Sequence, residues 1–149
     1  MNRKKLIIEK LLEGVQRSIE NINESLNAAQ ESRDDETKSS VGDKYETGRA
    51  MAQLEIEKLG EQLSQALAHR DVLNGLDIES TSEVVKSGSL VETNNGTYFL
   101  AIGFGKIDLG EEIVFVVSLS SPVGRALEGK SKGDKVQFLK QELLIVDIQ

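Results

Sequence analysis

Apolar residues recur in a heptad pattern, in alternating steps of four and three residues, along the first thirty positions of the chain. This register comprises Ile8, Leu12, Val15, Ile19, Ile22, Leu26 and Ala29. A second register, with Arg70 as its one polar interruption, comprises Ala52, Ile56, Leu59, Leu63, Ala66 and Leu73. A helix with such a narrow apolar stripe needs a partner helix to bury it. We therefore expect one helix over about residues 3–32, a second from residues 44–47 to 73, and an antiparallel coiled coil over residues 1–75.

The segment that separates the two registers, residues 31–46, is acidic and contains Gly42. Its acidic residues include Asp34, Asp35, Glu36, Asp43 and Glu46. A helical hairpin with a negatively charged tip is the simplest structure that fits this pattern. The tip either presents its carboxylates at a distance or is only a solvated loop whose charges keep other proteins away.

Composition excludes several classes of function. The 149 residues carry a net charge of −7, so binding to the phosphates of DNA or RNA is repelled over most of the surface. The chain has no cysteine, which excludes disulfides and thiolate metal sites, and its single histidine, His69, cannot build a histidine-rich zinc site. Any metal ion bound here would be a hard cation held by oxygen atoms.

The beginning of the chain resembles a secretory leader only superficially. Arg3 precedes a short apolar run, but Glu9 and Lys10 end that run too early, and no small-residue cleavage site follows. No stretch approaches the roughly 20 apolar residues that a membrane span requires. We expect a cytoplasmic, soluble protein that does not bind membranes.

From Leu76 onward the helical period gives way to short β-rich runs separated by turn residues. The candidate strands are Ser89–Glu92, Thr97–Ile102, Ile113–Ser118, Lys135–Leu139 and Leu143–Ile148. The Asn94-Asn95-Gly96 sequence between the first two is a strong hairpin signal, because these residues tolerate positive φ. The fold class predicted is α+β, in which residues 76–149 form a small antiparallel β domain.

One short helix interrupts these strands. In the segment from Ser120 to Gly129 a serine can cap, Pro122 suits the first helical position, and Gly129 suits the position just past the end. Capping is a much better explanation of Ser120 and Ser121 than nucleophilic catalysis, since no base is paired with them. We expect Val123, Ala126 and Leu127 of this helix to cover the sheet.

The segment from Ser121 to Lys130, Ser-Pro-Val-Gly-Arg-Ala-Leu-Glu-Gly-Lys, followed by Lys132-Gly133-Asp134-Lys135-Val136, resembles the C-terminal signature of bacterial Gre transcript cleavage factors. The close match covers the last thirty residues, and the order of coiled coil and β domain extends it in outline over the chain. The resemblance implies an FKBP-like C-terminal domain that docks on RNA polymerase near its secondary channel. It implies polymerase-binding roles for Ser121, Pro122, Arg125 and Lys130.

The resemblance also implies a role for the acidic tip. Family members insert the coiled coil toward the polymerase active centre, where tip carboxylates help to hold a Mg²⁺ ion and a water that cleaves backtracked RNA. Asp43 and Glu46 keep the family's Asp-x-x-Glu spacing after a glycine, here Gly42, and would act as the catalytic and metal-binding pair, with Asp34, Asp35 and Glu36 as accessory acids. The ion would be shared with the polymerase, because two carboxylates alone hold Mg²⁺ weakly.

Several alternatives remain open at the level of sequence. The stretch after Asp43 departs from the common family pattern, and Gly48 interrupts it, so a polymerase-binding regulator or inhibitor without cleavage stimulation is one alternative. A peptidyl-prolyl isomerase is a weaker one, since the five aromatic residues of this half supply few pocket walls. A coiled-coil interaction module is the third. It predicts self-association, whereas an intramolecular hairpin predicts a monomer that meets an RNA 3′ end only inside the polymerase complex.

Overall fold

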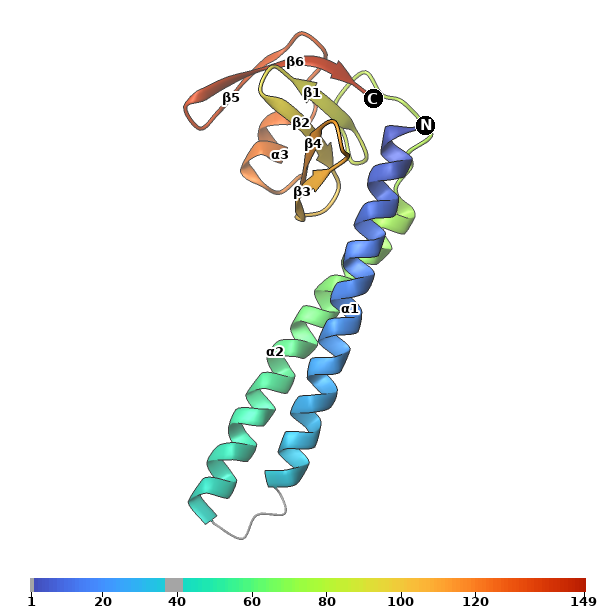
Figure 1. Ribbon diagram of the computed structural model, residues 1–149. Helices are drawn as coiled ribbons and strands as arrows, with labels where there is room; N and C mark the ends of the chain where they lie inside the picture. Colours follow the sequence, from blue (N-terminus) through green and yellow to red (C-terminus); the bar gives the residue numbers. More distant parts are fainter. Residues whose placement is uncertain (1, 37–41) are drawn as a thin grey trace. The chain divides into compact units, whose positions relative to one another are not determined.

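The computed structural model describes residues 2–36 and 42–149, and the side chains of residues 2–35 and 46–149. Two long helices, α1 (Arg3–Glu36) and α2 (Gly42–Gly75), precede six strands and a short helix (Figure 1). The later elements are β1 (Leu90–Thr93), β2 (Gly96–Leu100), β3 (Gly105–Asp108), β4 (Ile113–Val117), α3 (Pro122–Leu127), β5 (Lys135–Phe138) and β6 (Gln141–Ile148). The chain divides into two compact units. One is Glu13–Arg70, and the other joins Asp71–Gln149 to the start of α1 as far as Leu12.

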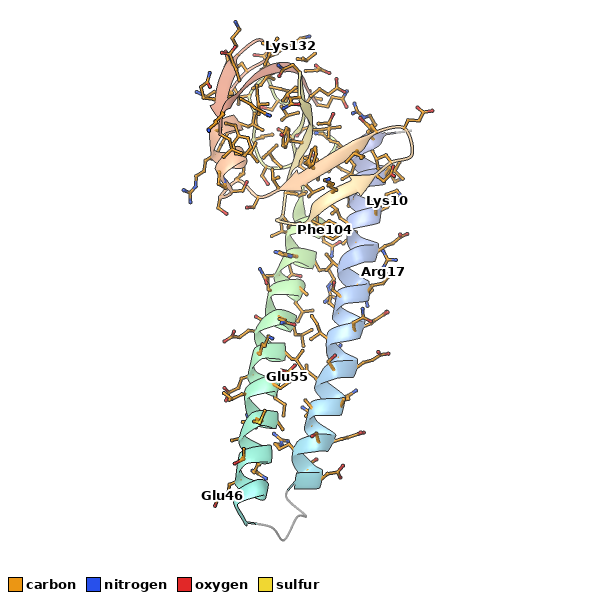
Figure 2. All side chains as sticks on the ribbon, turned by 60° about the vertical axis from the view of Figure 1, so that its left-hand side comes forward. Lys10, Arg17, Glu46, Glu55, Phe104 and Lys132 are labelled. Atoms are coloured by element: carbon orange, nitrogen blue, oxygen red, sulfur yellow. The ribbon has the colours of Figure 1, made fainter. Side chains whose placement is uncertain are left out.

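Within Glu13–Arg70 the two helices lie side by side, as Figures 1 and 2 show. The buried apolar residues of this unit all belong to the predicted registers: Val15, Ile19, Ala29, Ala52, Leu59 and Ala66. Near the reversal of the chain, Arg33 Nη1 donates a hydrogen bond to Gln53 Oε1 at 3.2 Å. The paired helices and their apolar seam are therefore confirmed. Charged residues such as Arg17 and Glu55 occupy the solvated faces (Figure 2).

Both helices are longer than the sequence predicts. Each has 34 residues, so α1 is about 50 Å long at 1.5 Å per residue. The acidic run that ends α1 contains no glycine or proline, the two residues that disfavour a helix most strongly. Gly48, which the sequence suggests as a weak point, lies inside α2 without interrupting it.

The first three turns of α1 carry a second apolar stripe that the heptad pattern does not predict. Ile7 and Leu11 are fully buried, although the register runs through their neighbours Ile8 and Leu12. These residues belong to the compact unit that contains the sheet. Asn2 caps the helix, since its Oδ1 accepts a hydrogen bond from the backbone N–H of Lys4 at 2.9 Å. The compact units divide the chain after Leu12 and after Arg70. The predicted domain boundary between residues 75 and 76 stays a prediction.

The six strands form one sheet in the order β3-β4-β2-β1-β6-β5. Every neighbouring pair is antiparallel except β2 and β4, which run parallel with Tyr98 opposite Phe115. The α+β class is confirmed, and the expectation of a wholly antiparallel sheet is corrected to a mixed one. Strand β3 is an addition to the predicted strands, which pass directly from Thr97–Ile102 to Ile113–Ser118. Because β3 pairs with β4 from the outside, β4 comes to lie parallel to β2.

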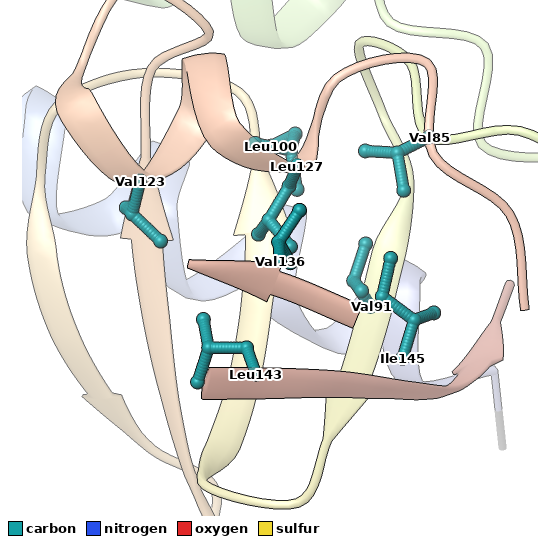
Figure 3. Close-up of a cluster of buried hydrophobic side chains, with 8 residues drawn as sticks. All are labelled: Val85, Val91, Leu100, Val123, Leu127, Val136, Leu143 and Ile145. Carbon is teal, nitrogen blue, oxygen red and sulfur yellow. The ribbon is translucent and has the colours of Figure 1, made fainter. Parts of the chain in front are cut away.

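Helix α3 covers one face of this sheet, as expected. Its Val123 and Leu127 lie in an apolar cluster with strand residues and Val85 (Figure 3). The cluster comprises Val85, Val91, Leu100, Val123, Leu127, Val136, Leu143 and Ile145. Residues at alternate strand positions, among them Leu90, Phe99 and Val116, are also fully or almost fully buried. Both faces of the central strands are therefore removed from water.

Candidate functional site

The predicted catalytic pair lies at the N-terminal end of α2. The helix begins at Gly42, so Asp43 and Glu46 both belong to its first turns. Residues three apart on a helix lie on the same face. The Asp-x-x-Glu spacing therefore requires a helical backbone at these positions, and the backbone is helical there. The Glu46 side chain is exposed at the end of the unit where the chain reverses (Figure 2), and that of Asp43 lies outside the described residues.

The predicted accessory acids lie at the same end of the helical unit. Asp34 and Asp35 are exposed in the last turn of α1, while Glu36 ends the helix and its side chain lies outside the described part. One carboxylate oxygen of Asp34 lies 3.6 Å from Arg33 Nε. The fold thus gathers acidic residues from the end of α1 and the start of α2 at one extremity of the hairpin.

The acidic residues at this end are of the chemical kind that binds a magnesium ion. Carboxylate oxygens are the ligands that Mg²⁺ prefers, and the ion commonly takes one or two of them while keeping several waters. Among the residues whose side chains are described, no group of three or more acidic or histidine residues converges as a metal site. The assignment of Asp43 and Glu46 as a magnesium-binding pair stays a prediction.

The C-terminal signature has a structural explanation at several of its positions. Ser121 caps α3, since its Oγ accepts from the Gly124 N–H at 3.1 Å and donates to the Ser118 carbonyl at 2.6 Å. A Cβ atom on Gly124 would lie 2.0 Å from that same carbonyl oxygen, so no other residue fits there. Gly129 adopts a φ of +78° and donates to the Val85 carbonyl at 2.8 Å. The predicted capping is confirmed.

The other signature residues are available at the surface. Pro122, Arg125 and Lys130 are exposed, and neither cation forms an ion pair with a described residue. Between residues 125 and 140 the chain carries five basic residues against two acidic ones. This segment is therefore locally basic in a protein with a net charge of −7, and the assignment of polymerase binding to these residues stays a prediction.

Sequence reasoning missed a charged cluster at the start of α1. Arg3 binds Glu112 through two nitrogens, Nε to Oε1 and Nη2 to Oε2, both at 2.9 Å, and binds Glu92 Oε1 through Nη1 at 2.5 Å. Burial opposes the charge of Arg3, but the hydrogen bonds to both carboxylates outweigh it and raise its pKa. No local pattern signals these partners, because Glu92 and Glu112 lie far away in sequence.

Lys4 lies beside that cluster and is almost completely buried, with only 5% of its surface exposed. Burial lowers the pKa of its amine. The charge of Asp77 opposes this change, and that of Lys86 adds to it. The basic start of the chain is therefore part of the folded structure at Arg3 and Lys4.

The unit that contains the sheet has surface hollows, and two of them are defined by the residues that line them. The larger, of about 690 Å³, is lined by Thr81, Ser82, Glu83, Ser131, Lys132, Asp147 and Ile148, and the other by Arg3, Leu6, Leu109, Glu111 and Glu112. Neither lining contains an aromatic residue. Several aromatic side chains pack within the fold. Phe99 is fully buried, and the ring centroids of Tyr98 and Phe115 lie 5.5 Å apart. These hollows do not resemble the aromatic pocket that isomerase activity requires.

Comparisons with known proteins identify similar solved structures only. No protein-family model and no curated protein matches the chain. The chain is similar to a crystal structure described as GreA factor homolog 1 (Gfh1) of Thermus thermophilus, with 22% identity over 93% of this chain and 94% of that one and a TM-score of 0.37. A structure described as the transcription factor Gfh1 is similar at 23% identity over 95% and 92% of the two chains, with a TM-score of 0.36. No helix among the described residues is long and apolar enough to cross a membrane.

Proposed function

We propose that this protein is a cytoplasmic transcription elongation factor of the Gre type. It binds RNA polymerase, inserts the acidic end of its helical hairpin into the secondary channel, and assists the Mg²⁺-dependent cleavage of backtracked RNA. The observation that carries the proposal is the placement of Asp43 and Glu46 on one face of the first turns of α2. The resemblance of residues 121–136 to the Gre signature supports it.

The chain contributes position and charge, and the polymerase performs the reaction. Asp43 and Glu46 would each offer a carboxylate to a Mg²⁺ ion shared with the polymerase, and such an ion activates water and stabilises charge on a phosphate. Asp34, Asp35 and Glu36 add negative charge nearby. The RNA 3′ end is met only inside the polymerase complex, and the protein has no turnover of its own.

The length of the helices suits delivery to a recessed site. A helix about 50 Å long is longer than a small domain is wide, and its partner stiffens it along the seam of buried residues. Because the seam is filled within one chain, no second copy is needed to bury it. We therefore propose that the protein is a monomer.

The docking surface is assigned to the basic region around α3. Arg125 and Lys130 are exposed and free of ion pairs with described residues, which leaves both able to bind carboxylates of a partner. Pro122 is exposed at the first position of α3. Ser121 would act mainly by holding this helix, since its hydroxyl is already used in the cap.

The second candidate is a polymerase-binding regulator that does not stimulate cleavage. It is favoured by residues 44–50, where the chain departs from the common Gre sequence and places Gly48 in the second turn of α2. A glycine at this point weakens the helix that orients the two carboxylates. The two candidates share the docking surface and differ only in what the tip does.

An RNA polymerase complex stalled in a backtracked state distinguishes these functions. We expect the wild-type protein to bind it and to shorten the RNA, and the variants Asp43→Asn and Glu46→Gln to bind equally well without shortening it. The variant Glu55→Gln, which removes an exposed carboxylate from the side of α2, serves as the matched control and should behave as the wild type. Binding without shortening by the wild type would support the regulator instead, and absence of binding would exclude both.

A further inference from the structure

The tip of the β5–β6 hairpin presents an apolar side chain in an unfavourable setting. Leu139 is 84% exposed, more than any other large hydrophobic residue whose side chain is described. Its backbone φ is +58°, and among the described residues it is the only one other than glycine with a positive φ. Glycine or asparagine fits such a position far better, and either would avoid exposing an apolar surface to water.

This conformation is imposed by a well-supported hairpin. The ladder between β5 and β6 extends to its last pair, Phe138 with Gln141, so that only Leu139 and Lys140 form the turn. On the outer face, Glu142 lies 3.8 Å from Lys135 Nζ and accepts a hydrogen bond from Gln137 Nε2 at 3.2 Å. The strands thus fix the position of the tip.

The β1–β2 turn holds the hairpin from a second side. Asn94 Oδ1 accepts from the Leu144 N–H at 2.8 Å, and the Asn94 N–H donates to the Leu144 carbonyl at 3.1 Å. The side chain of Asn95 donates to Gln141 Oε1, next to the turn. The backbone of such a braced tip loses little conformational freedom when its side chains bind a partner, which lowers the entropic cost of binding.

The charge beside Leu139 indicates the kind of surface that it fits. Lys140 forms no ion pair with any described residue, whereas the charge of Lys135 is already met by Glu142. Arg125, Lys130 and Lys132 precede it along the chain and are exposed as well. The tip therefore combines an apolar side chain with a cation that has no partner within the described part of the molecule.

We propose that Leu139 and Lys140 form an anchor that docks into an apolar pocket rimmed by carboxylates on a partner protein. This inference rests on the proposed function, so the pocket would belong to RNA polymerase. A protein partner is favoured over nucleic acid, because a leucine offers no stacking surface to bases and the chain as a whole carries a charge of −7. The anchor adds a second contact region to that assigned to α3.

Affinity for RNA polymerase, measured with the full-length protein at two salt concentrations, tests the anchor. We expect Leu139→Gly to unfold at the same or a higher temperature than the wild type and yet to bind polymerase about tenfold or more weakly, as loss of a buried anchor does. Leu139→Met, which keeps the apolar surface, should bind as the wild type. Lys140→Glu should weaken binding, most strongly at low salt.

The matched control is Val146→Ser, which removes an exposed apolar side chain from β6 away from the tip and should leave affinity unchanged. Equal affinity of Leu139→Gly and wild type would overturn the anchor and leave the proposed function standing. Displacement of polymerase from the tip by duplex DNA would assign the surface to nucleic acid and would also overturn the proposed protein-binding anchor. If the wild type does not bind polymerase at all, the proposed function fails, and the anchor fails with it.

Discussion

Arg3 and Glu112, 109 residues apart in the sequence, form an ion pair through two hydrogen bonds of 2.9 Å each. Arg3 also binds Glu92 on β1, so one guanidinium joins the first turn of α1 to two places in the sheet region. Planar, two-point pairing of this kind is stronger and more specific in geometry than a single contact between two charges. It explains why the start of a helix predicted to serve the coiled coil belongs to the unit that contains the sheet.

Removal of this ion pair should destabilise that unit. We expect Arg3→Gln to lower the free energy of unfolding by about 1 kcal/mol, a modest value because the side chains of all three partners are about one-third exposed. A double-mutant cycle with Glu112→Gln measures the coupling by chemical denaturation. A coupling energy near zero would show that the two-point geometry contributes nothing to stability.

Lys4 should make stability depend on pH in the alkaline range. Its pKa in the folded protein is lowered from the ordinary value of 10.5, mainly by burial, so the unfolded chain binds the proton more tightly. Stability should therefore rise as pH increases from the lowered value toward 10.5, because the neutral amine is tolerated inside the fold. Lys4→Met should be more stable at pH 7 and should lose this rise. Thermal unfolding of both proteins between pH 7 and 10.5 measures the difference.

Gly124 and Gly60 should respond to alanine with opposite signs. A Cβ on Gly124 would overlap the Ser118 carbonyl at 2.0 Å, and we expect Gly124→Ala to cost about 3 kcal/mol or more. Gly60 lies within α2 with nothing inside 4 Å of the added atom, and Gly60→Ala should stabilise by about 0.5–1 kcal/mol through helix propensity. Denaturant midpoints of the two variants provide the comparison, and a neutral Gly124→Ala would contradict the packing described for α3.

Features that depend on local periodicity could be predicted, and those that depend on distant partners could not. The seam through Val15 and Leu59 repeats every seven residues, so the pattern alone identifies it. Ile7, by contrast, lies outside this repeat and is buried in the unit that contains the sheet. The parallel pairing of β2 and β4 depends on where strand β3 lies, which the sequence did not predict. The positive φ of Leu139 could not be predicted from the sequence either, since leucine is among the residues least suited to this backbone conformation.

The same distinction applies to the candidate site. Asp43 and Glu46 lie on one face if a helix begins before them, and α2 begins at Gly42. The roles proposed for Arg125 and Lys130 come from the family resemblance, because exposed cations carry no signal of their own in the sequence. The Arg3 cluster had no local signal, and only the folded chain reveals it.

The spacing of the two tip carboxylates should matter more than their number. Exchanging residues 45 and 46, as Tyr45→Glu with Glu46→Tyr, keeps the composition and the net charge but places the acid two positions after Asp43. On a helix, residues two apart point in different directions, so the two carboxylates should no longer reach one ion. We expect polymerase binding to persist, RNA shortening to fall at least about tenfold, and higher Mg²⁺ concentration to restore little of it. Cleavage at the wild-type rate would show that the tip acts through its charge alone, without a defined pair of ligands.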